Sequence, residues 1–150
     1  MPSQIDEYLS YRFAVEIGGT MVAGFTELAG LTAQTEVFEY KEGGLNSYTH
    51  KLPGRTTYTN VTLKRGMADS TDLYDWHHRI ATRATVKDER KAVSIIQYDG
   101  QHREVRRWNL AGAWPVKWVG PGFNSGGAEV SFESLELAFA DFEMVSQKGA

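Results

Sequence analysis

Short segments that alternate apolar and polar residues, separated by glycines, constrain this chain most, because they limit it to a mainly β fold. Tyr11 to Ile17 places its large apolar side chains at odd positions, and this period of two predicts a strand with one buried face. Gly18-Gly19 follows as a hairpin turn signal, so we expect a short return strand from Met21 to Phe25. The same pattern predicts strands over residues 32–41 and 58–64.

Glycine and proline predict a loop between those last two strands. Gly43-Gly44 opens this loop, which we expect to run to about Pro53. The segment Leu52-Pro53-Gly54-Arg55 is typical of a turn that leads into the strand beginning at Tyr58.

The second half of the chain predicts a further hairpin. Strands over residues 92–98 and 105–110 flank Asp99-Gly100. A four-residue loop over 99–102 would set Ile96 opposite Val105, and cross-strand packing favours this register over the one that a two-residue turn would impose.

Two later segments predict strands of unusual character. Residues 114–118 contain Pro115, which favours an edge or irregular strand. Ala128 to Phe142 predicts one strand of about fifteen residues, well above the usual five or six. Its apolar phase changes near Ser134, so we expect a bulge or a change of burial partner there.

One helix is expected, over residues 69–82. Asp69-Ser70 offers an N-cap, and Asp72 places negative charge in the first turn. Its apolar stripe for packing on a sheet consists of Leu73, Trp76, His77 and Ile80. The fold class is therefore an antiparallel β-sandwich or barrel with one flanking α-helix.

Composition sets the remaining limits. A chain of 150 residues predicts a single domain over 1–150, with residues 1–10 as a flexible N-terminal segment. No cysteine is present, which excludes disulfides and thiolate metal sites, and the net charge of −3 lacks the basic excess of a sequence-specific DNA-binding protein. The sequence shows no membrane-spanning run and no signal peptide, so we expect synthesis in the cytoplasm.

No pattern predicts catalytic, cofactor-binding or metal-ligating residues. His77 and His78 are adjacent on the helix, so their side chains diverge by roughly 100° and cannot share one metal well. The acidic residues of the last strand lack a histidine or carboxylate partner, and a solvated or lumen-facing row is expected of Glu129, Glu133 and Asp141.

A basic cluster lies beside Trp108 and consists of Arg103, Arg106 and Arg107. Nucleic acid could bind there, but pairing with acidic residues of a neighbouring strand or subunit accounts for it equally well.

Two features are unexplained for a monomer. Several strands carry apolar residues on both faces, as Val37 and Phe38 show, and the long final strand would leave an exposed edge. A neighbouring subunit could cover these surfaces. The alternative is a closed barrel with a cavity for a small hydrophobic ligand, which would make the protein a soluble ligand-binding β-barrel.

Segments spread in order over residues 11–140 resemble the tail-tube proteins of contractile phages and the inner-tube proteins of phage-tail-like contractile injection systems. The segments that carry the resemblance are residues 11–17, 23–31, 35–44, 51–66, 69–76, 108–110, 113–118 and 135–138.

The resemblance implies a subunit that forms hexameric rings, which stack into a hollow tube inside a contractile sheath. Sheets of neighbouring subunits would join into one barrel around the lumen, a fold shared with the type VI secretion tube protein. The implied partners are other copies of the chain, a sheath protein, a baseplate hub or spike and a tube-terminating cap, with a cargo effector or DNA in the lumen. The particle would be a virion tail or an injection particle that can be released from the cell, and the tube would have no enzymatic activity.

We expect different segments to stack the rings and to close them. The polar, glycine-rich segment from Lys41 to Arg55 suits contact with the next ring, and its expected stacking residues are Lys41, Glu42, Leu45, Tyr48, Lys51, Leu52 and Arg55. The final strand would join subunits within a ring, through Val130, Phe132, Leu135, Leu137 and Phe139.

Overall fold

A computed structural model of the protein describes residues 13–22, 24–41, 43, 49–66, 70–82, 89–123, 125–127 and 131–146. Along the chain the elements are β1 (Phe13–Ile17), β2 (Thr20–Val22), β3 (Phe25–Ala29), β4 (Ala33–Tyr40), β5 (His50–Tyr58), β6 (Val61–Gly66), α1 (Asp72–Thr82), β7 (Lys91–Tyr98), β8 (Glu104–Val119), β9 (Phe132–Ala138) and β10 (Asp141–Ser146). The mainly β, antiparallel fold with one helix is confirmed.

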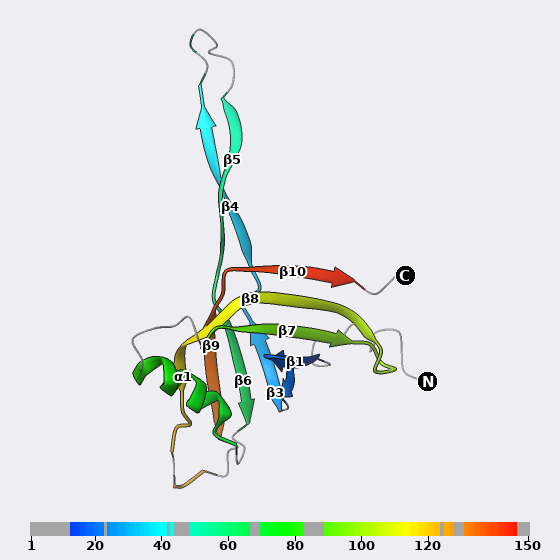
Figure 1. Ribbon diagram of the computed structural model, residues 1–150, viewed down its shortest axis with the longest axis vertical. Coiled ribbons are helices and arrows are strands. Elements are labelled where there is room, and N and C mark those ends of the chain that lie inside the picture. The colour runs from blue at the N-terminus through cyan, green and yellow to red at the C-terminus, as the bar shows by residue number, and fades with distance from the viewer. Residues whose placement is uncertain are drawn as a thin grey trace.

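One antiparallel sheet, folded across itself, makes the body of the molecule. Its strands lie in the order β2-β1-β7-β8-β9-β6-β3, and β10 also pairs with β8. The first half of β8 lies between β7 and β10, while its second half pairs with β9. In Figure 1, β7, β8 and β10 run horizontally, whereas β3, β6 and β9 run nearly vertically.

The sheet folds at a corner where two neighbouring strands bend together. Gly112 in β8 has φ of 61°, a left-handed conformation that glycine adopts without steric cost. On the adjacent strand, the break between β9 and β10 falls at Phe139 and Ala140, and the Ala140 N–H donates to the Ala111 carbonyl at 2.9 Å. Both sheet halves therefore share β8 and enclose one core.

The core lies between the two halves and beneath the helix. Its buried members are Val15, Ile17, Val61, Leu63, Leu73, Trp76, Val93, Ile95, Leu110, Ala113, Leu135 and Leu137. The alternation predicted for β1 is confirmed, because Val15 and Ile17 are both buried. The turn at Gly18-Gly19 is also confirmed, since Ile17 pairs directly with Thr20 and both glycines have positive φ, as a type I′ turn requires.

Helix α1 packs on β8 through the predicted apolar stripe, of which Leu73 and Trp76 are fully buried. It starts at Asp72 rather than 69, because Thr71 accepts the first helical hydrogen bond, from the Asp75 N–H. The expected cap at Asp69 lies outside the described residues. The Trp76 indole donates to the Glu89 carbonyl at 2.7 Å and thereby ties the helix to the chain just before β7.

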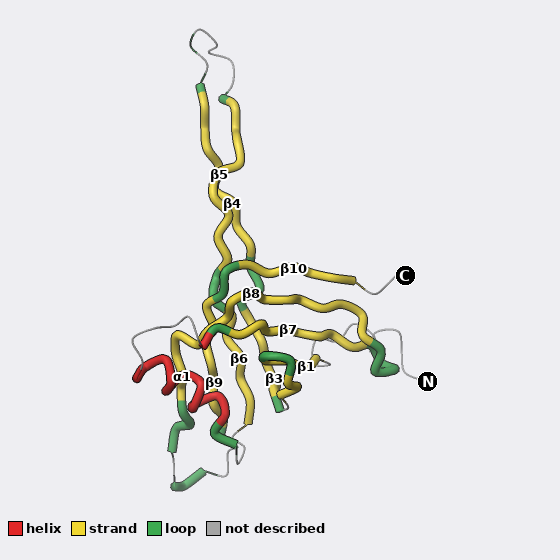
Figure 2. The backbone as a smooth tube through the Cα atoms, viewed as in Figure 1, coloured by secondary structure: helices red, strands yellow, loops and turns green. Residues whose placement is uncertain are grey.

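The β4–β5 hairpin projects far from the body (Figures 1 and 2). It forms a separate two-stranded sheet that the chain enters from β3 and leaves into β6. The predicted loop over residues 43–53 is therefore wrong in its second half, because β5 begins at His50 and runs through Pro53 and Gly54. An edge strand tolerates this proline, and a bulge accommodates the extra residue, since Gly54 and Arg55 together oppose Glu36.

Three other strand predictions need correction. The expected return strand to Phe25 ends at Val22, and Phe25 begins the separate strand β3 on the other half of the sheet. The expected strand over 58–64 is divided, because β5 ends at Tyr58 and β6 begins at Val61. The two strands expected over 105–110 and 114–118 are one continuous strand, β8. Among the described residues, the half that contains Pro115 has a strand partner on one side only, as expected of an edge.

The predicted fifteen-residue strand is also wrong. It is two strands, β9 and β10, and no phase change occurs at Ser134, because the inward positions within β9 are odd throughout and begin at Glu133. The start of the predicted strand, with Val130 and Glu129, lies outside the described residues.

Neither predicted register of the β7–β8 hairpin is correct. Val93 lies opposite Leu110 and Ile96 lies opposite Arg107. The connecting turn is longer than expected because the Asp99 carboxylate accepts the backbone N–H groups of Gln101 and Arg103, and His102 takes a positive φ. This register places the buried side chains of Val93 and Leu110 directly opposite each other.

Candidate assembly surfaces

The β4–β5 hairpin exposes apolar side chains on both of its faces. Phe38 and Leu52 lie opposite each other, as do Val37 and Pro53, and directly opposed residues share a face. Phe38 is 60% exposed and Val37 is 63% exposed. No residue of β4 is buried, so the hairpin has no core of its own.

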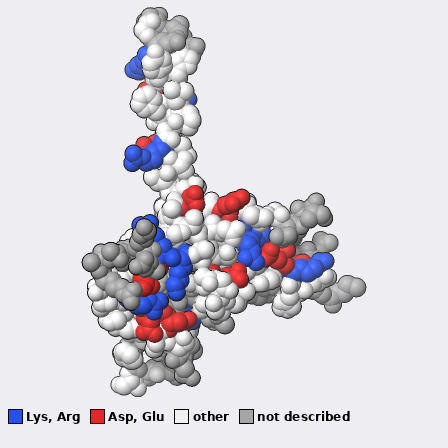
Figure 3. Space-filling model, viewed as in Figure 1, with Lys and Arg blue, Asp and Glu red and all other residues white. Residues whose placement is uncertain are grey.

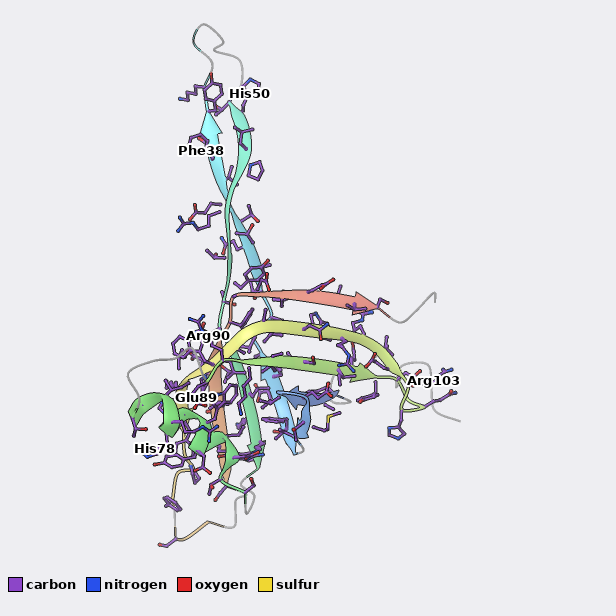
Figure 4. The ribbon with its side chains drawn as sticks, in the orientation of Figure 1. Phe38, His50, His78, Glu89, Arg90 and Arg103 are labelled. Atoms are coloured by element: carbon purple, nitrogen blue, oxygen red, sulfur yellow. The ribbon has the colours of Figure 1, made fainter. Side chains whose placement is uncertain are left out.

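The face that carries Phe38 also carries Tyr40, His50 and Glu36, because alternate residues of β4 point to the same side. The rings of Tyr40 and His50 are 6.3 Å apart. We call this surface, made by Glu36, Phe38, Tyr40, His50 and Leu52, the aromatic face of the hairpin. Figure 4 shows Phe38 and His50 in the outer part of the hairpin, away from the body.

An aromatic cluster fixes the base of the hairpin to the body. The Tyr58 ring lies 5.2 Å from Phe142 in an edge-to-face arrangement and 6.1 Å from Phe139. The Thr59 hydroxyl donates to the Gly30 carbonyl at 2.9 Å and links the two strands where they leave the body. Aromatic pairs of this kind contribute about 0.5–1.5 kcal/mol beyond their buried area, so this cluster anchors the base of the hairpin.

The expected stacking residues are placed on this hairpin as far as the structure describes them. Lys41, Lys51, Leu52 and Arg55 are exposed, whereas Glu42, Leu45 and Tyr48 lie outside the described residues. On the face that Figure 3 shows, the described part of the hairpin is mostly uncharged, with a few charged side chains along it.

The expected subunit-joining strand is corrected in part. β9 is paired on both sides, with β8 and β6, so it has no free edge for a neighbour. Leu135 and Leu137 are fully buried in the subunit's own core and offer no surface. Phe132 is 38% exposed and Phe139 is partly buried in the cluster above, so these two remain predictions.

The strand with a free edge is β10. Among the described residues it pairs with β8 alone, from Asp141↔Ala111 to Ser146↔Arg106. Strand β2 lies at the opposite end of this half of the sheet and likewise has one partner, β1. An open strand edge is a template for pairing with another chain.

A groove opens between β3 and the inner face of the other sheet half. Its volume is about 280 Å³, and its lining is mainly apolar, with Phe13, Leu28, Leu31, Ile95 and Trp108. The polar residues around it are Thr26, Glu27 and Gln97. In the part of the chain that the structure describes, the sheet does not close into a barrel, so this is an open groove and not the enclosed ligand cavity of the alternative interpretation.

Arg106 lies beside this groove, opposite Gln97 of β7. It is two residues from Trp108 on β8, so it shares the inward-facing side of the strand. Its Nε is buried and has no hydrogen-bond partner in the described part of the molecule. The other two arginines of the predicted basic cluster pair with acids of the same subunit, Arg107 with Glu16 and Glu104, and Arg103 with Asp99.

An ionic cluster around the buried Arg65 ties α1 to the sheet, and no local sequence pattern predicts it. The Arg65 guanidinium binds the Glu133 carboxylate at 2.5 Å and also binds Asp72 at the start of α1. The Trp118 indole donates to the second oxygen of Glu133 at 3.0 Å. Glu133 is 3% exposed, so its predicted place in a solvated or lumen-facing row is wrong.

This cluster sets the charge state of the helix start. Burial alone would raise the pKa of the Asp72 carboxyl, but hydrogen bonding and attraction from Arg65, helped by Ser70 and the Leu73 N–H, hold that pKa below its ordinary value. The ionised carboxylate therefore both binds Arg65 and lies where the helix dipole favours negative charge.

Two of the histidines lie far apart, His78 on α1 and His50 on the hairpin (Figure 4). The His78 ring stacks on Tyr74 at 5.5 Å. In the described ranges, no group of three metal-ligating side chains occurs, and no helix is long and apolar enough to cross a membrane.

The folded sheet, single helix and projecting hairpin belong to a known class of structural protein. The family model of the T4-like virus tail tube protein gp19 matches residues 9–143, and the chain belongs to this family. No curated protein matches the sequence.

Solved structures agree with the family. The chain is 27% identical to a chain in the sheath–tube complex of an extracellular contractile injection system, PVC, in its extended state, with a TM-score of 0.81 and coverage of 97% of this chain and 98% of that one. It is 25% identical to a chain in the baseplate of the anti-feeding prophage, with a TM-score of 0.80 and coverage of 99% and 98%. Hcp1 from Flavobacterium johnsoniae, 13% identical with a TM-score of 0.56 over 91% and 96% of the chains, shares the fold alone.

The resemblance drawn from the sequence is thereby confirmed. The protein is a tail-tube protein of phage-tail-like contractile injection systems, with a structural role in the tube. Its solved relatives occur in particles with a sheath, a baseplate and a tube cap.

Proposed function

We propose that the protein forms hexameric rings that stack into the hollow inner tube of a contractile particle. The observation that carries this proposal is the projecting β4–β5 hairpin, whose apolar side chains are exposed in the part of the subunit that the structure describes. Large apolar surface left exposed marks an interaction site. A second copy of the chain is the natural partner in a protein of the tube family.

Ring closure would use the two open edges of one sheet half. β10 and β2 lie at opposite ends of the order β2-β1-β7-β8-β10. Pairing β10 of one subunit with the β2–β1 edge of the next is a head-to-tail contact, and such contacts close into rings when the rotation permits. Phe132 and Phe139 remain proposed as additional contacts between subunits.

Ring stacking would use the hairpin. Leu52 and the predicted Leu45 and Tyr48 would supply most of the binding energy, because a few apolar or aromatic residues usually dominate an interface. The exposed charges Lys41, Lys51 and Arg55, with Glu42, would set register, since exposed ion pairs contribute only about 0–1 kcal/mol each.

The remaining partners follow from the particles in which the relatives occur. The tube would bind a sheath protein along its length, a baseplate hub or spike at one end and a terminating cap at the other. The lumen would carry a cargo effector or DNA. The subunit would be made in the cytoplasm, would have no enzymatic activity and would leave the cell only as part of the particle.

Electron microscopy of the purified protein tests this proposal. Rings of sixfold symmetry or stacked tubes are expected, with each subunit contact burying more than about 2,000 Å², the size of an obligate interface. A sample of monodisperse monomers at high concentration would contradict it.

A further inference from the structure

We propose that the groove beside β3 is the receptor for the aromatic face of the β4–β5 hairpin of a second copy. This inference rests on the proposed function and specifies the contact through which one subunit holds another. Two apolar surfaces of the described chain are open, and their apolar side chains and charges are complementary.

The apolar parts correspond in size. The groove offers about 280 Å³ between Phe13, Leu28, Leu31, Ile95 and Trp108. A cavity of roughly 150 Å³ already accommodates a benzene molecule. The groove therefore has room for the Phe38 ring and for a second apolar side chain, for which Leu52 directly across the hairpin is suited.

The charged parts also correspond. Arg106 lies on the inward-facing side of β8 with a buried Nε that lacks an acceptor among the described residues. A buried donor left without a partner is costly, so an acceptor from outside the subunit would be favoured. Glu36 is the carboxylate on the aromatic face of the hairpin, and we assign it as the acceptor for Arg106.

The opposite face of the hairpin fits less well. It carries Val37 with Pro53, and Glu39 with Lys51 directly opposite. Glu39 lies opposite Lys51, whereas Glu36 lies opposite the bulged pair Gly54 and Arg55. The two carboxylates therefore lie on opposite faces of the same strand. This difference supplies matched controls within a single strand.

Cross-linking tests the contact directly, because the chain contains no cysteine and introduced thiols are unique. Subunits with Phe38→Cys are mixed with subunits with Thr26→Cys, which lies at the groove, and allowed to assemble. A short bismaleimide is used, since a disulfide would demand a Cα separation of about 4.4–6.8 Å. The control replaces Phe38→Cys with Val37→Cys, on the other face of the same strand.

The expected result is a covalent Phe38→Cys to Thr26→Cys dimer in assembled tubes, identified by mass spectrometry, with much less product from the Val37→Cys control. Tubes that form normally but give no such dimer, or equal product from both mixtures, would overturn the inference. Failure of the unmodified protein to form tubes would instead overturn the proposed function. An apolar ligand found in the groove by native mass spectrometry of tubes would also overturn the inference.

Charge reversal provides a second test. Glu36→Arg is expected to raise the protein concentration needed for tube formation by about tenfold or more, because it places like charges together at a buried contact. Glu39→Arg should have a much smaller effect, and adding Arg106→Glu to Glu36→Arg should restore assembly. Equal behaviour of Glu36→Arg and Glu39→Arg, with circular dichroism unchanged in both, would count against the assignment.

Discussion

The body and the β4–β5 hairpin of this protein differ in where they place their large apolar side chains. In the body, Leu63, Leu135 and Leu137 are fully buried, and each such side chain stabilises the fold by about 1.5–3 kcal/mol. On the hairpin, side chains of the same kind face solvent, as Phe38 and Leu52 do. The body is thus specified by contacts within one chain, whereas the hairpin carries apolar residues that its described subunit leaves exposed.

The hairpin nevertheless has a defined geometry before any partner binds. The hydroxyls of Thr35 and Thr56 hydrogen-bond across the strands at 2.8 Å, and the bulge at Gly54 fixes the local twist. An isolated two-stranded hairpin is at best marginally stable in water. Its persistence in the tube would therefore depend on the neighbour that covers it.

Removing the hairpin should have the largest effect on assembly. Replacing residues 37–54 with Asn-Gly joins Glu36 to Arg55 through a two-residue turn, which matches the observed pairing of Thr35 with Thr56. We expect an intact body and single rings but no long tubes, as seen by electron microscopy. Tubes of normal length would show that the hairpin is not the stacking element, and loss of rings as well would mean that it also closes the ring.

The elements that could be predicted from the sequence are those whose side chains face the core of the body. The strand β1, its glycine turn and the stripe of α1 obey local rules, because alternation or helical spacing there faces one core. Local rules fail for β5, because they predict a turn at Pro53 and Gly54. The strand tolerates both residues, since it has a free edge and a bulge there. Likewise β8 continues through Gly112 and Pro115 because a neighbouring strand supports it.

Contacts between residues far apart in the chain could not be predicted from local sequence patterns. Arg65 and Glu133 are far apart in the chain and meet because β6 and β9 are paired in register. Glu133 alternates with its neighbours as a residue of a solvated row would, and only the pairing with β6 places Arg65 beside it. The break between β9 and β10 was missed for the same reason, because it is set by the corner of the neighbouring strand β8.

Breaking the ionic cluster should destabilise the body most. Arg65→Met leaves the buried Glu133 carboxylate without its cation, and removal of one partner of a buried pair costs about 3–5 kcal/mol. Urea unfolding of unassembled protein measures this loss. The double variant Arg65→Met/Glu133→Leu should recover part of it, and equal instability of both variants would argue that the charge is not the cause.

A pair of leucine substitutions sharpens the comparison. Leu63→Ala in the core should lower the free energy of unfolding by about 2–5 kcal/mol. Leu52→Ala on the exposed hairpin should change it by less than about 0.5 kcal/mol, while reducing tube formation. A large loss of monomer stability from Leu52→Ala would mean that the hairpin is part of the subunit's own core.

The smallest effect should appear at acid pH. The pKa of Asp72 is held below its ordinary value of 3.8, so its contribution to stability is complete above that pH and is lost as the pH falls through the lower, folded-state value. Asp72→Asn should therefore flatten the fall in melting temperature below about pH 4 and lower stability at neutral pH. An unchanged pH profile would show that Asp72 does not contribute.

Hydrogen exchange in monomers and in tubes tests the dependence of the hairpin on a neighbour most directly. Amide protons of β4 and β5 in the monomer should exchange much faster than those of β6, β8 and β9, since few buried contacts protect them. On assembly, protection of the hairpin should rise towards that of the body, while the body strands away from the subunit contacts change little. Equal protection of the hairpin in monomers and tubes would contradict the account.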